Sequence, residues 1–412
     1  MRYLTIKETA EKWNITERRV QHLCKLGKIH GAEKWAGSWR IPIDAQKPSD
    51  SRTKAVKTVN SFHMPMPRRT PYISMSDLYH TPGRAEESIE SLKGHPEAQM
   101  LLRAEIEYSR GNIDAVYSIS RDILSSHSGL FAVLGGGMLL ALCATWRGDI
   151  EMWNEAKKHI CEAPCNSDSD RDLIKLAVAA TNNTLYDTAE YPDWFKIGNF
   201  EHLPSDALPA ARVHYIKYLI ISAKALAMKE FYLEDVTGLG LMKSIPFILR
   251  PMISQVVVDR TVVPELYLRL LCAISYHYSG DDTSAVEQIE KALDIALPDK
   301  LLGILAEHRR SLDTLLDDAL KARSPEIFAE YRELHGVYLH GWTTLHNQIY
   351  NKSVSITLTP REREAARLAA FGFSNPEIAQ KLGISLPSAK SLIFYAMNKT
   401  GANSRLELAS FI

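Results

Sequence analysis

Two twelve-residue stretches decide the fold: Thr5-Ile6-Lys7-Glu8-Thr9-Ala10-Glu11-Lys12-Trp13-Asn14-Ile15-Thr16 and Ser374-Asn375-Pro376-Glu377-Ile378-Ala379-Gln380-Lys381-Leu382-Gly383-Ile384-Ser385. In each stretch a hydroxyl residue precedes Glu by three positions, and this capping box satisfies free N–H groups at a helix start. Asn14 or Gly383 tolerates the left-handed conformation that ends a helix. The final Thr or Ser caps the next helix. Each stretch therefore predicts a helix-turn-helix.

The C-terminal stretch lies within a longer segment that is rich in helix signals. Thr359 and Glu362 form a capping box with Pro360 at the first helical position, which predicts a helix that ends before Gly372. After the turn, a longer helix is predicted from Leu386 to Lys399. One face of it should pack inward at helical spacing, namely Ala389, Leu392, Ile393 and Ala396. The outer faces then carry Ser388, Lys390, Ser391, Phe394, Tyr395 and Asn398.

Residues 358–412 resemble the LuxR-type (GerE-like) DNA-binding domain. The matching positions are Leu358-Thr359-Pro360-Arg361-Glu362-Arg363-Glu364, Gly372, Ser374-Asn375-Pro376-Glu377-Ile378-Ala379, Leu382-Gly383-Ile384-Ser385, Lys390, Lys399 and Ser404-Arg405. The resemblance implies a four-helix head whose last-but-one helix enters the major groove of DNA. It implies that Lys390, Ser391 and Phe394 face the bases, and that Ser388, Lys399 and Arg405 hold phosphates.

The segment departs from the usual LuxR-type pattern at two places. Ser388-Ala389-Lys390-Ser391-Leu392 stands where Thr-Val-Lys-x-His is usual, and Lys399-Thr400 stands where Lys-Leu is usual. Phe394 cannot hydrogen-bond to a base, although it can touch a thymine methyl group. The alternative is that Phe394 and Tyr395 belong to the core or to a dimer contact. The DNA sequence that this segment would recognise therefore cannot be predicted from these residues.

The N-terminal stretch continues into a basic second helix and a hairpin. Val20, Leu23 and Leu26 face inward at helical spacing. The outer face of that helix is polar and basic, with Glu17, Arg18, Arg19, Gln21, His22 and Lys25. Residues 34–42, Lys-Trp-Ala-Gly-Ser-Trp-Arg-Ile-Pro, predict two short strands around a glycine turn.

Residues 3–44 resemble the MerR/excisionase class of small winged helix-turn-helix domains, on Leu4-Thr5-Ile6-Lys7-Glu8-Thr9-Ala10 and Trp39-Arg40-Ile41-Pro42. The resemblance implies that Arg18, Arg19 and His22 approach the groove, and that Lys34, Trp39 and Arg40 form the wing. Alternatively, Trp35 and Trp39 cover the small core. We expect this domain to span 1–46 and a basic flexible linker to span 47–71.

Between residues 72 and 353 the pattern is helical, with turns at Ser109-Arg110-Gly111-Asn112, Trp146-Arg147-Gly148-Asp149 and Tyr278-Ser279-Gly280-Asp281. Gly111 and Gly148 are 37 residues apart, near the roughly 34-residue period of a tetratricopeptide repeat. The segment 266–297 resembles such a repeat loosely. We expect a TPR-like α-helical array whose concave surface binds a small-molecule or protein effector.

The apolar run from Leu130 to Trp146 has 17 residues, fewer than the roughly 20 that a membrane span requires. We expect a buried core helix preceded by a turn at Gly135-Gly136-Gly137 and no contact with a membrane. Because the chain begins directly with the helix-turn-helix pattern, no signal peptide is expected. The five cysteines are scattered and odd in number, which fits a reducing cytoplasm better than a disulfide framework.

The net charge of zero conceals an asymmetry. Residues 1–70 hold 15 Lys and Arg against 6 Asp and Glu, and residues 358–412 hold 7 against 4. The rest of the chain is acidic, with 27 against 39. This charge distribution indicates that the two terminal segments contact DNA phosphates and that the acidic middle segment does not.

The sequence thus predicts a mainly α bacterial transcription regulator that binds double-stranded DNA as a homodimer in the cytoplasm. The alternative is a non-catalytic scaffold, whose array binds a partner protein and whose heads dock or dimerise. No cofactor and no metal are expected: Cys161, Cys165 and His159 do not complete a zinc site, and residues 238–244 lack the glycine spacing of a phosphate-binding loop. No pattern of residues indicates an enzyme.

Overall fold

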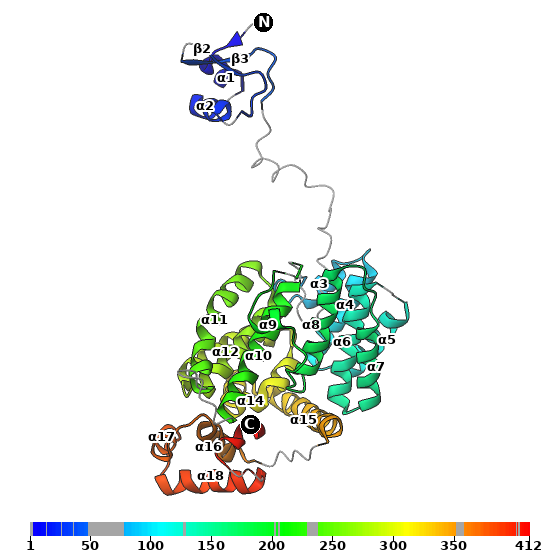
Figure 1. Cartoon of the computed structure of the whole chain (residues 1–412), viewed down its shortest axis with the longest axis vertical. Coiled ribbons are helices and arrows are strands. Elements are labelled where there is room, and N and C mark those ends of the chain that lie inside the picture. The colour runs from blue at the N-terminus through cyan, green and yellow to red at the C-terminus, as the bar shows by residue number, and fades with distance from the viewer. Residues whose placement is uncertain are drawn as a thin grey trace. The chain divides into compact units, whose positions relative to one another are not determined.

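The computed structural model describes residues 3–13, 15–25, 27–35, 37–47, 78–126, 129–201, 203–204, 207–228, 238–351, 358–400, 402 and 404–412. The chain forms two compact units, Met1–Pro65 and Met66–Ile412, which are described separately (Figure 1). The predicted turn residue Asn14, the predicted core residue Leu26 and all of the predicted linker after Lys47 lie outside the described residues.

The described residues of the small unit form two helices and three short strands. Their bounds are β1 Tyr3–Leu4, α1 Ile6–Trp13, α2 Glu17–Lys25, β2 Glu33–Trp35 and β3 Ser38–Pro42. The antiparallel sheet has the order β1-β3-β2, with Leu4 opposite Ile41 and Lys34 opposite Trp39. The core is made by residues from both helices and from the segment that follows them: Ala10, Trp13, Val20, Leu23, Cys24, Ile29 and Ile41. The predicted helices and hairpin are therefore present.

The predicted capping boxes form in the structure. The Thr5 backbone N–H donates to Glu8 Oε2 at 2.8 Å, and the Ser374 backbone N–H donates to Glu377 Oε2 at 2.7 Å. A third box joins Thr359 and Glu362. These bonds satisfy donors that would otherwise be free, so each helix begins where the hydroxyl residue predicts it.

The helical array forms most of the larger unit. Its helices are α3 Ala85–Glu90, α4 Pro96–Arg110, α5 Ile113–Ser126, α6 Leu130–Arg147, α7 Ile150–Cys161, α8 Asp168–Asn183, α9 Asp193–Lys196, α10 Leu208–Met228, α11 Gly238–Asp259, α12 Val262–Tyr278, α13 Asp282–Ala296, α14 Leu302–Arg323 and α15 Phe328–Tyr350, with 3₁₀ helices η3 Leu297–Asp299 and η4 Pro325–Ile327. Gly111, Gly148 and Gly280 all have positive φ, which confirms the three predicted turns.

The last helices of the array pack against the first ones. Helix α14 contacts α4, and α15 contacts α6 (Figure 1). The approach of α15 to α6 is close, because a Cβ atom at Gly341 would lie 2.0 Å from the backbone oxygen of Trp146. In an open solenoid each repeat contacts its neighbours alone; here the array instead closes on itself and encloses an interior.

Helix α6 corrects one expectation from the sequence. Gly135, Gly136 and Gly137 do not form a turn before the helix, because they are buried inside it. Cβ atoms there would lie 2.6 Å from Leu101, 3.0 Å from Leu124 and 2.7 Å from Ile160. The three glycines therefore let side chains from three neighbouring helices pack directly on the α6 backbone, which offsets their low helix propensity.

Two described helices, α6 and α11, are long and apolar enough to cross a membrane by length and composition. In α6, 72% of the apolar window is buried within the array, so it is a core helix of this unit. In α11, 28% of the window is buried, and Pro246 and Pro251 lie within the helix.

The C-terminal head comprises α16 Pro360–Ala370, α17 Asn375–Lys381, α18 Leu386–Thr400 and η5 Glu407–Phe411. The fourth helix is thus a 3₁₀ helix. Helices α16, α17 and α18 pack around a small core to which Ala365, Ile378, Ala389 and Ile393 contribute. Gly383 has φ +61°, which is the left-handed turn that the sequence predicts.

Candidate nucleic-acid interface

The two helix-turn-helix segments share one turn geometry. In the small unit the Ile15 N–H donates to the Ala10 carbonyl at 3.1 Å, and in the head the Ile384 N–H donates to the Ala379 carbonyl at 3.0 Å. The two pairs occupy the same places in the aligned stretches. Similar residues at identical spacing thus make the same backbone hydrogen bond across the turn in both segments.

Helix α18 presents a polar face to solvent. Its inward residues Ala389, Ile393 and Ala396 are buried, as the helical spacing predicts, and Leu392 is half-buried. Lys390 and Ser391 are exposed on the opposite side. Because the buried residues fix the rotation of α18 about its axis, the exposed residues form a defined surface that a groove can receive.

Phe394 and Tyr395 extend this surface with two aromatic rings. They are 61% and 53% exposed, and their ring centroids lie 5.9 Å apart in an edge-to-face arrangement. These exposures exclude the alternative that either ring belongs to the core of the head. Two predicted roles are left for each ring, namely contact with a DNA base and contact with a second copy of the chain.

The three predicted phosphate contacts differ in their surroundings. The exposed Ser388 hydroxyl lies 2.8 Å from Ser385 Oγ at the start of α18. Arg405 is half-buried and donates to the Phe373 carbonyl at 2.6 Å and to Asn375 Oδ1 at 3.0 Å. The structure therefore gives Arg405 a part in holding the turn between α16 and α17, and its contact with phosphate stays a prediction. The Lys399 side chain lies outside the described residues.

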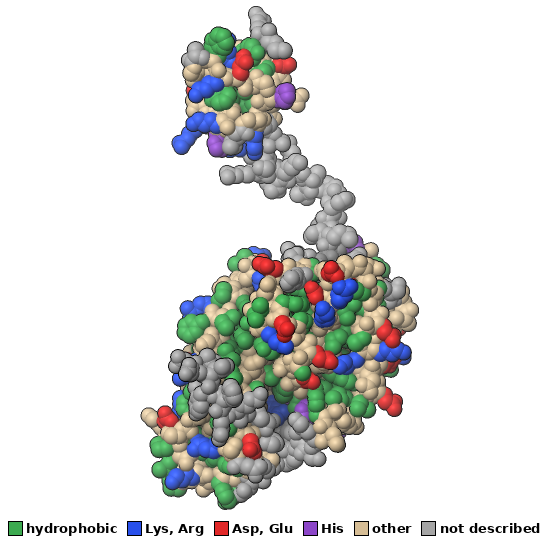
Figure 2. All heavy atoms as spheres, viewed as in Figure 1, with side chains coloured by type: hydrophobic (Ala, Val, Ile, Leu, Met, Phe, Trp, Pro, Cys, Tyr) green, Lys and Arg blue, Asp and Glu red, His purple; other side chains and the backbone are tan. Residues whose placement is uncertain are grey.

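In the small unit, the predicted groove residues come together on α2. Arg18, Arg19 and His22 line one open hollow with Thr16, Gln21 and Lys25. Figure 2 shows Lys, Arg and His side chains over the part of this unit where Figure 1 draws α2. The outward face of α2 is thus cationic and polar, as a DNA-facing helix requires. Gln21 and Lys25 belong to it as well, as the sequence pattern predicts, although the resemblance to the MerR/excisionase class does not single them out.

The hairpin places its basic residues beside aromatic ones. Lys34 and Arg40 are exposed, and the Arg40 guanidinium lies 4.9 Å from the ring centroid of Trp35, which is 60% exposed. Trp39 packs against the core of the unit, so one of the two tryptophans has the covering role that the sequence left open. The other, Trp35, is exposed on the hairpin and has the Arg40 guanidinium over its ring, which is a cation–π contact.

The contacts of the head with the array leave the polar face of α18 exposed. Phe371 packs edge-to-face on Tyr278 of α12 at 5.3 Å, and Lys381 donates to the Gly280 carbonyl at 3.2 Å. The last residues of the head lie against α10. These contacts come from α16, α17 and η5, so the array does not cover Lys390 or Ser391.

Comparison with known protein families matches the C-terminal part of the chain. Residues 356–412 match the family of bacterial regulatory proteins described as the luxR family, which supports a DNA-binding transcription regulator. No curated protein and no solved structure is significantly similar to the chain. The match includes all of α16, α17 and α18, so it coincides with the head whose geometry is described above.

Proposed function

We propose that this chain is a sequence-specific transcription regulator that binds double-stranded DNA through α18 of the C-terminal head. The observation that carries the proposal is the exposed face of Lys390, Ser391 and Phe394 on a helix of a luxR-family segment. Lysine can donate to guanine, serine can donate or accept, and phenylalanine can touch a thymine methyl group.

We further propose that α2 of the small unit binds a second stretch of duplex. Its cationic face, with Arg18 and His22 exposed, and the basic hairpin with Lys34 and Arg40 support this role. The array would then connect two DNA-binding heads and respond to an effector or partner. A homodimer is the expected state, because two-fold sites on DNA match two-fold protein symmetry. The proposal includes no catalytic step and places the protein in the cytoplasm.

The test is the salt dependence of DNA binding by the full chain, measured by fluorescence anisotropy with pooled genomic fragments. We expect the logarithm of the affinity to fall linearly with the logarithm of salt concentration, with a slope of roughly −0.9 per neutralised phosphate. Binding that is absent at low salt would refute the proposal. Binding without a slope would favour the scaffold alternative.

Two substitutions assign the contribution of each head. Lys390→Ala should cost about 1–3 kcal/mol on the preferred sequence if it reads a base, and Arg18→Ala should lower the salt slope by about one unit if it holds a phosphate. The matched control is Lys243→Ala, which removes an exposed lysine from α11 of the array. Equal effects of the control and of Lys390→Ala would argue against a specific interface on α18.

A further inference from the structure

The interior of the array contains two adjoining hollows. Their volumes are about 60 and 80 Å³, and each has room for several water molecules, since one needs roughly 10–15 Å³. Lys217, Glu307 and Tyr338 line both hollows. They come from α10, α14 and α15, so the site exists because the array closes on itself.

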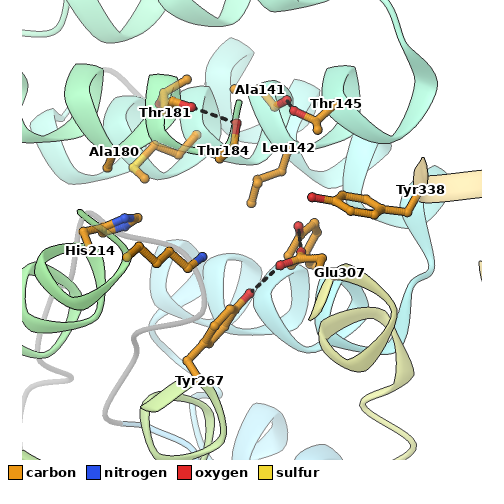
Figure 3. A pocket seen from close by; sticks show the side chains of 13 residues that line it. Ala141, Leu142, Thr145, Ala180, Thr181, Thr184, His214, Tyr267, Glu307 and Tyr338 are labelled. Atoms are coloured by element: carbon orange, nitrogen blue, oxygen red, sulfur yellow. Dashed lines mark hydrogen bonds between the residues drawn. The ribbon is translucent and has the colours of Figure 1, made fainter. Parts of the chain in front are cut away.

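Glu307 is held at the centre by aromatic residues from two other helices. Tyr108 of α4 and Tyr267 of α12 each donate a hydrogen bond to its carboxylate, the latter at 3.4 Å. Trp146 in turn donates to the Tyr108 oxygen at 3.4 Å. Figure 3 shows Glu307 and Tyr267 facing Thr181 and Thr184 across the hollow, with the Tyr338 hydroxyl group directed into it. The hydrogen bonds from Tyr108 and Tyr267 thus hold the Glu307 carboxylate in place in the absence of a ligand.

Lys217 lacks a comparable partner. Its ammonium lies 4.7 Å from the Tyr267 ring centroid, but among the described residues no hydrogen bond and no ion pair joins it to an acceptor. Burial lowers the pKa of Lys217, although Glu307 opposes this shift. A half-buried ammonium without an acceptor is costly, and an anion from outside would relieve that cost.

The remaining walls are apolar, with a few neutral polar groups. Met138 and Leu142 line one hollow, and Leu271 and Ile274 line the other. The Thr181 hydroxyl is buried and has no partner among the described residues.

Among the described ionisable side chains around the hollows, one lysine is left without an acceptor. Burial lowers the pKa of His214 and of His308 to about 3, so both rings are neutral at pH 7. The ionisable side chains are therefore Lys217 and Lys224 against Glu307, and burial raises the pKa of Glu307. Lys224 already donates to the Tyr278 hydroxyl group and to the Ile412 oxygen, so Lys217 is the cation that is left for an anionic ligand.

We propose that the two hollows form one binding site for a small amphipathic monocarboxylate, whose carboxylate accepts hydrogen bonds from Lys217 and whose apolar body lies against α6 and α12. This inference rests on the proposed function, because such a ligand would be the effector of the array. Lys224 connects this site to the C-terminal head, because it lines the second hollow and also donates to the backbone oxygen of Ile412 at 3.0 Å.

The test is isothermal titration calorimetry of the full chain with butanoate, hexanoate, octanoate and phenylacetate, and with the matched amides and amines. We expect saturable binding of at least one carboxylate, at least tenfold tighter than its amide, and no binding of the amines. Equal binding of carboxylate and amide, or no binding of any carboxylate, would overturn the inference.

Three variants identify the residue that recognises the carboxylate. Lys217→Met should weaken binding at least tenfold without lowering the melting temperature of the free protein, because it removes a cation that lacks an acceptor. Glu307→Gln should leave carboxylate affinity equal or higher, because it removes the opposing charge. The matched control, Lys243→Met, should change neither quantity. Unchanged affinity in Lys217→Met would refute the site.

DNA binding of the same samples separates the two proposals. Loss of carboxylate binding in Lys217→Met with intact DNA affinity in the absence of ligand is the expected result. If the unmodified chain binds DNA but none of the carboxylates, this inference fails and the proposed function stands. If it binds a carboxylate but no DNA, the proposed function fails.

Discussion

The Lys224 ammonium donates a 3.0 Å hydrogen bond to the backbone oxygen of Ile412, which ties α10 of the array to the end of the C-terminal head. The same ammonium donates to the Tyr278 hydroxyl group at 2.9 Å, and the Tyr278 ring packs against Phe371 of the head. The Arg367 guanidinium of α16 lies 5.6 Å from the centroid of that ring. Lys224 and Tyr278 therefore join the array to the head, in addition to the hydrogen bond from Lys381 to the Gly280 carbonyl.

Lys224→Met should loosen this contact, because it removes both hydrogen bonds while keeping the apolar stem. We expect faster hydrogen exchange in 358–371 and 404–412, measured by mass spectrometry on the full chain. Lys175→Met, at an exposed lysine of α8, is the control. Unchanged exchange in the head would show that the contact does not depend on Lys224.

Two glycines of α15 should respond to alanine in opposite directions. A Cβ at Gly341 would lie 2.0 Å from a backbone oxygen of α6, whereas one at Gly336 meets nothing within 4 Å. Gly341→Ala should therefore destabilise the larger unit by about 3 kcal/mol, and Gly336→Ala should stabilise it by roughly 0.5–1 kcal/mol through helix propensity. Urea unfolding measures both. A stable Gly341→Ala variant would contradict the closed packing of α15 on α6.

Arg405→Ala should destabilise the head as well as affect DNA binding. The guanidinium donates to two acceptors at the turn between α16 and α17, and hydrogen bonds from a charged group contribute about 1.5–3 kcal/mol. Hydrogen exchange in 372–377 should rise. Arg361→Ala, at an exposed arginine of α16, is the control. If DNA affinity fell with no change in exchange, Arg405 would act on phosphate alone.

The larger unit should lose stability below pH 6.5. Burial lowers the pKa of His335 to about 4, while its hydrogen bond to the Ala306 carbonyl opposes the shift. The unfolded chain therefore binds a proton at higher pH than the folded one, so the stability conferred by the neutral ring is present above pH 6.5 and falls as pH drops toward 4. The loss is on the order of 3 kcal/mol for this ring.

His335→Asn tests this origin, because asparagine can hydrogen-bond but does not titrate. The melting temperature of the variant should depend less steeply on pH between 6.5 and 4 than that of the unmodified protein. Parallel pH profiles would assign the acid sensitivity to other groups, such as His214 and His308.

Local signals in the sequence predict the heads well. Thr5, Thr359 and Ser374 begin helices as predicted, and Gly383 makes the predicted turn. The face of α18 follows from the spacing of Ala389, Ile393 and Ala396. These features depend on residues three or four positions apart, so the chain alone specifies them.

The interior site of the array is different, because its members are far apart in the sequence. Lys217 is one of three cations in the mainly apolar helix α10, with Arg212 and Lys224, so no local pattern singles it out. Tyr108, Glu307 and Tyr338 meet there because α14 and α15 return to α4 and α6.

By itself the sequence determined where helices begin, where they turn and which residues of α2 and α18 face outward, since backbone hydrogen bonds and helical periodicity act over a few residues. The tertiary structure decided that Gly135, Gly136 and Gly137 lie inside a helix, that Arg405 is held within the head, and that the array encloses a lysine and a glutamate. These outcomes depend on close packing between distant helices, which no local pattern encodes.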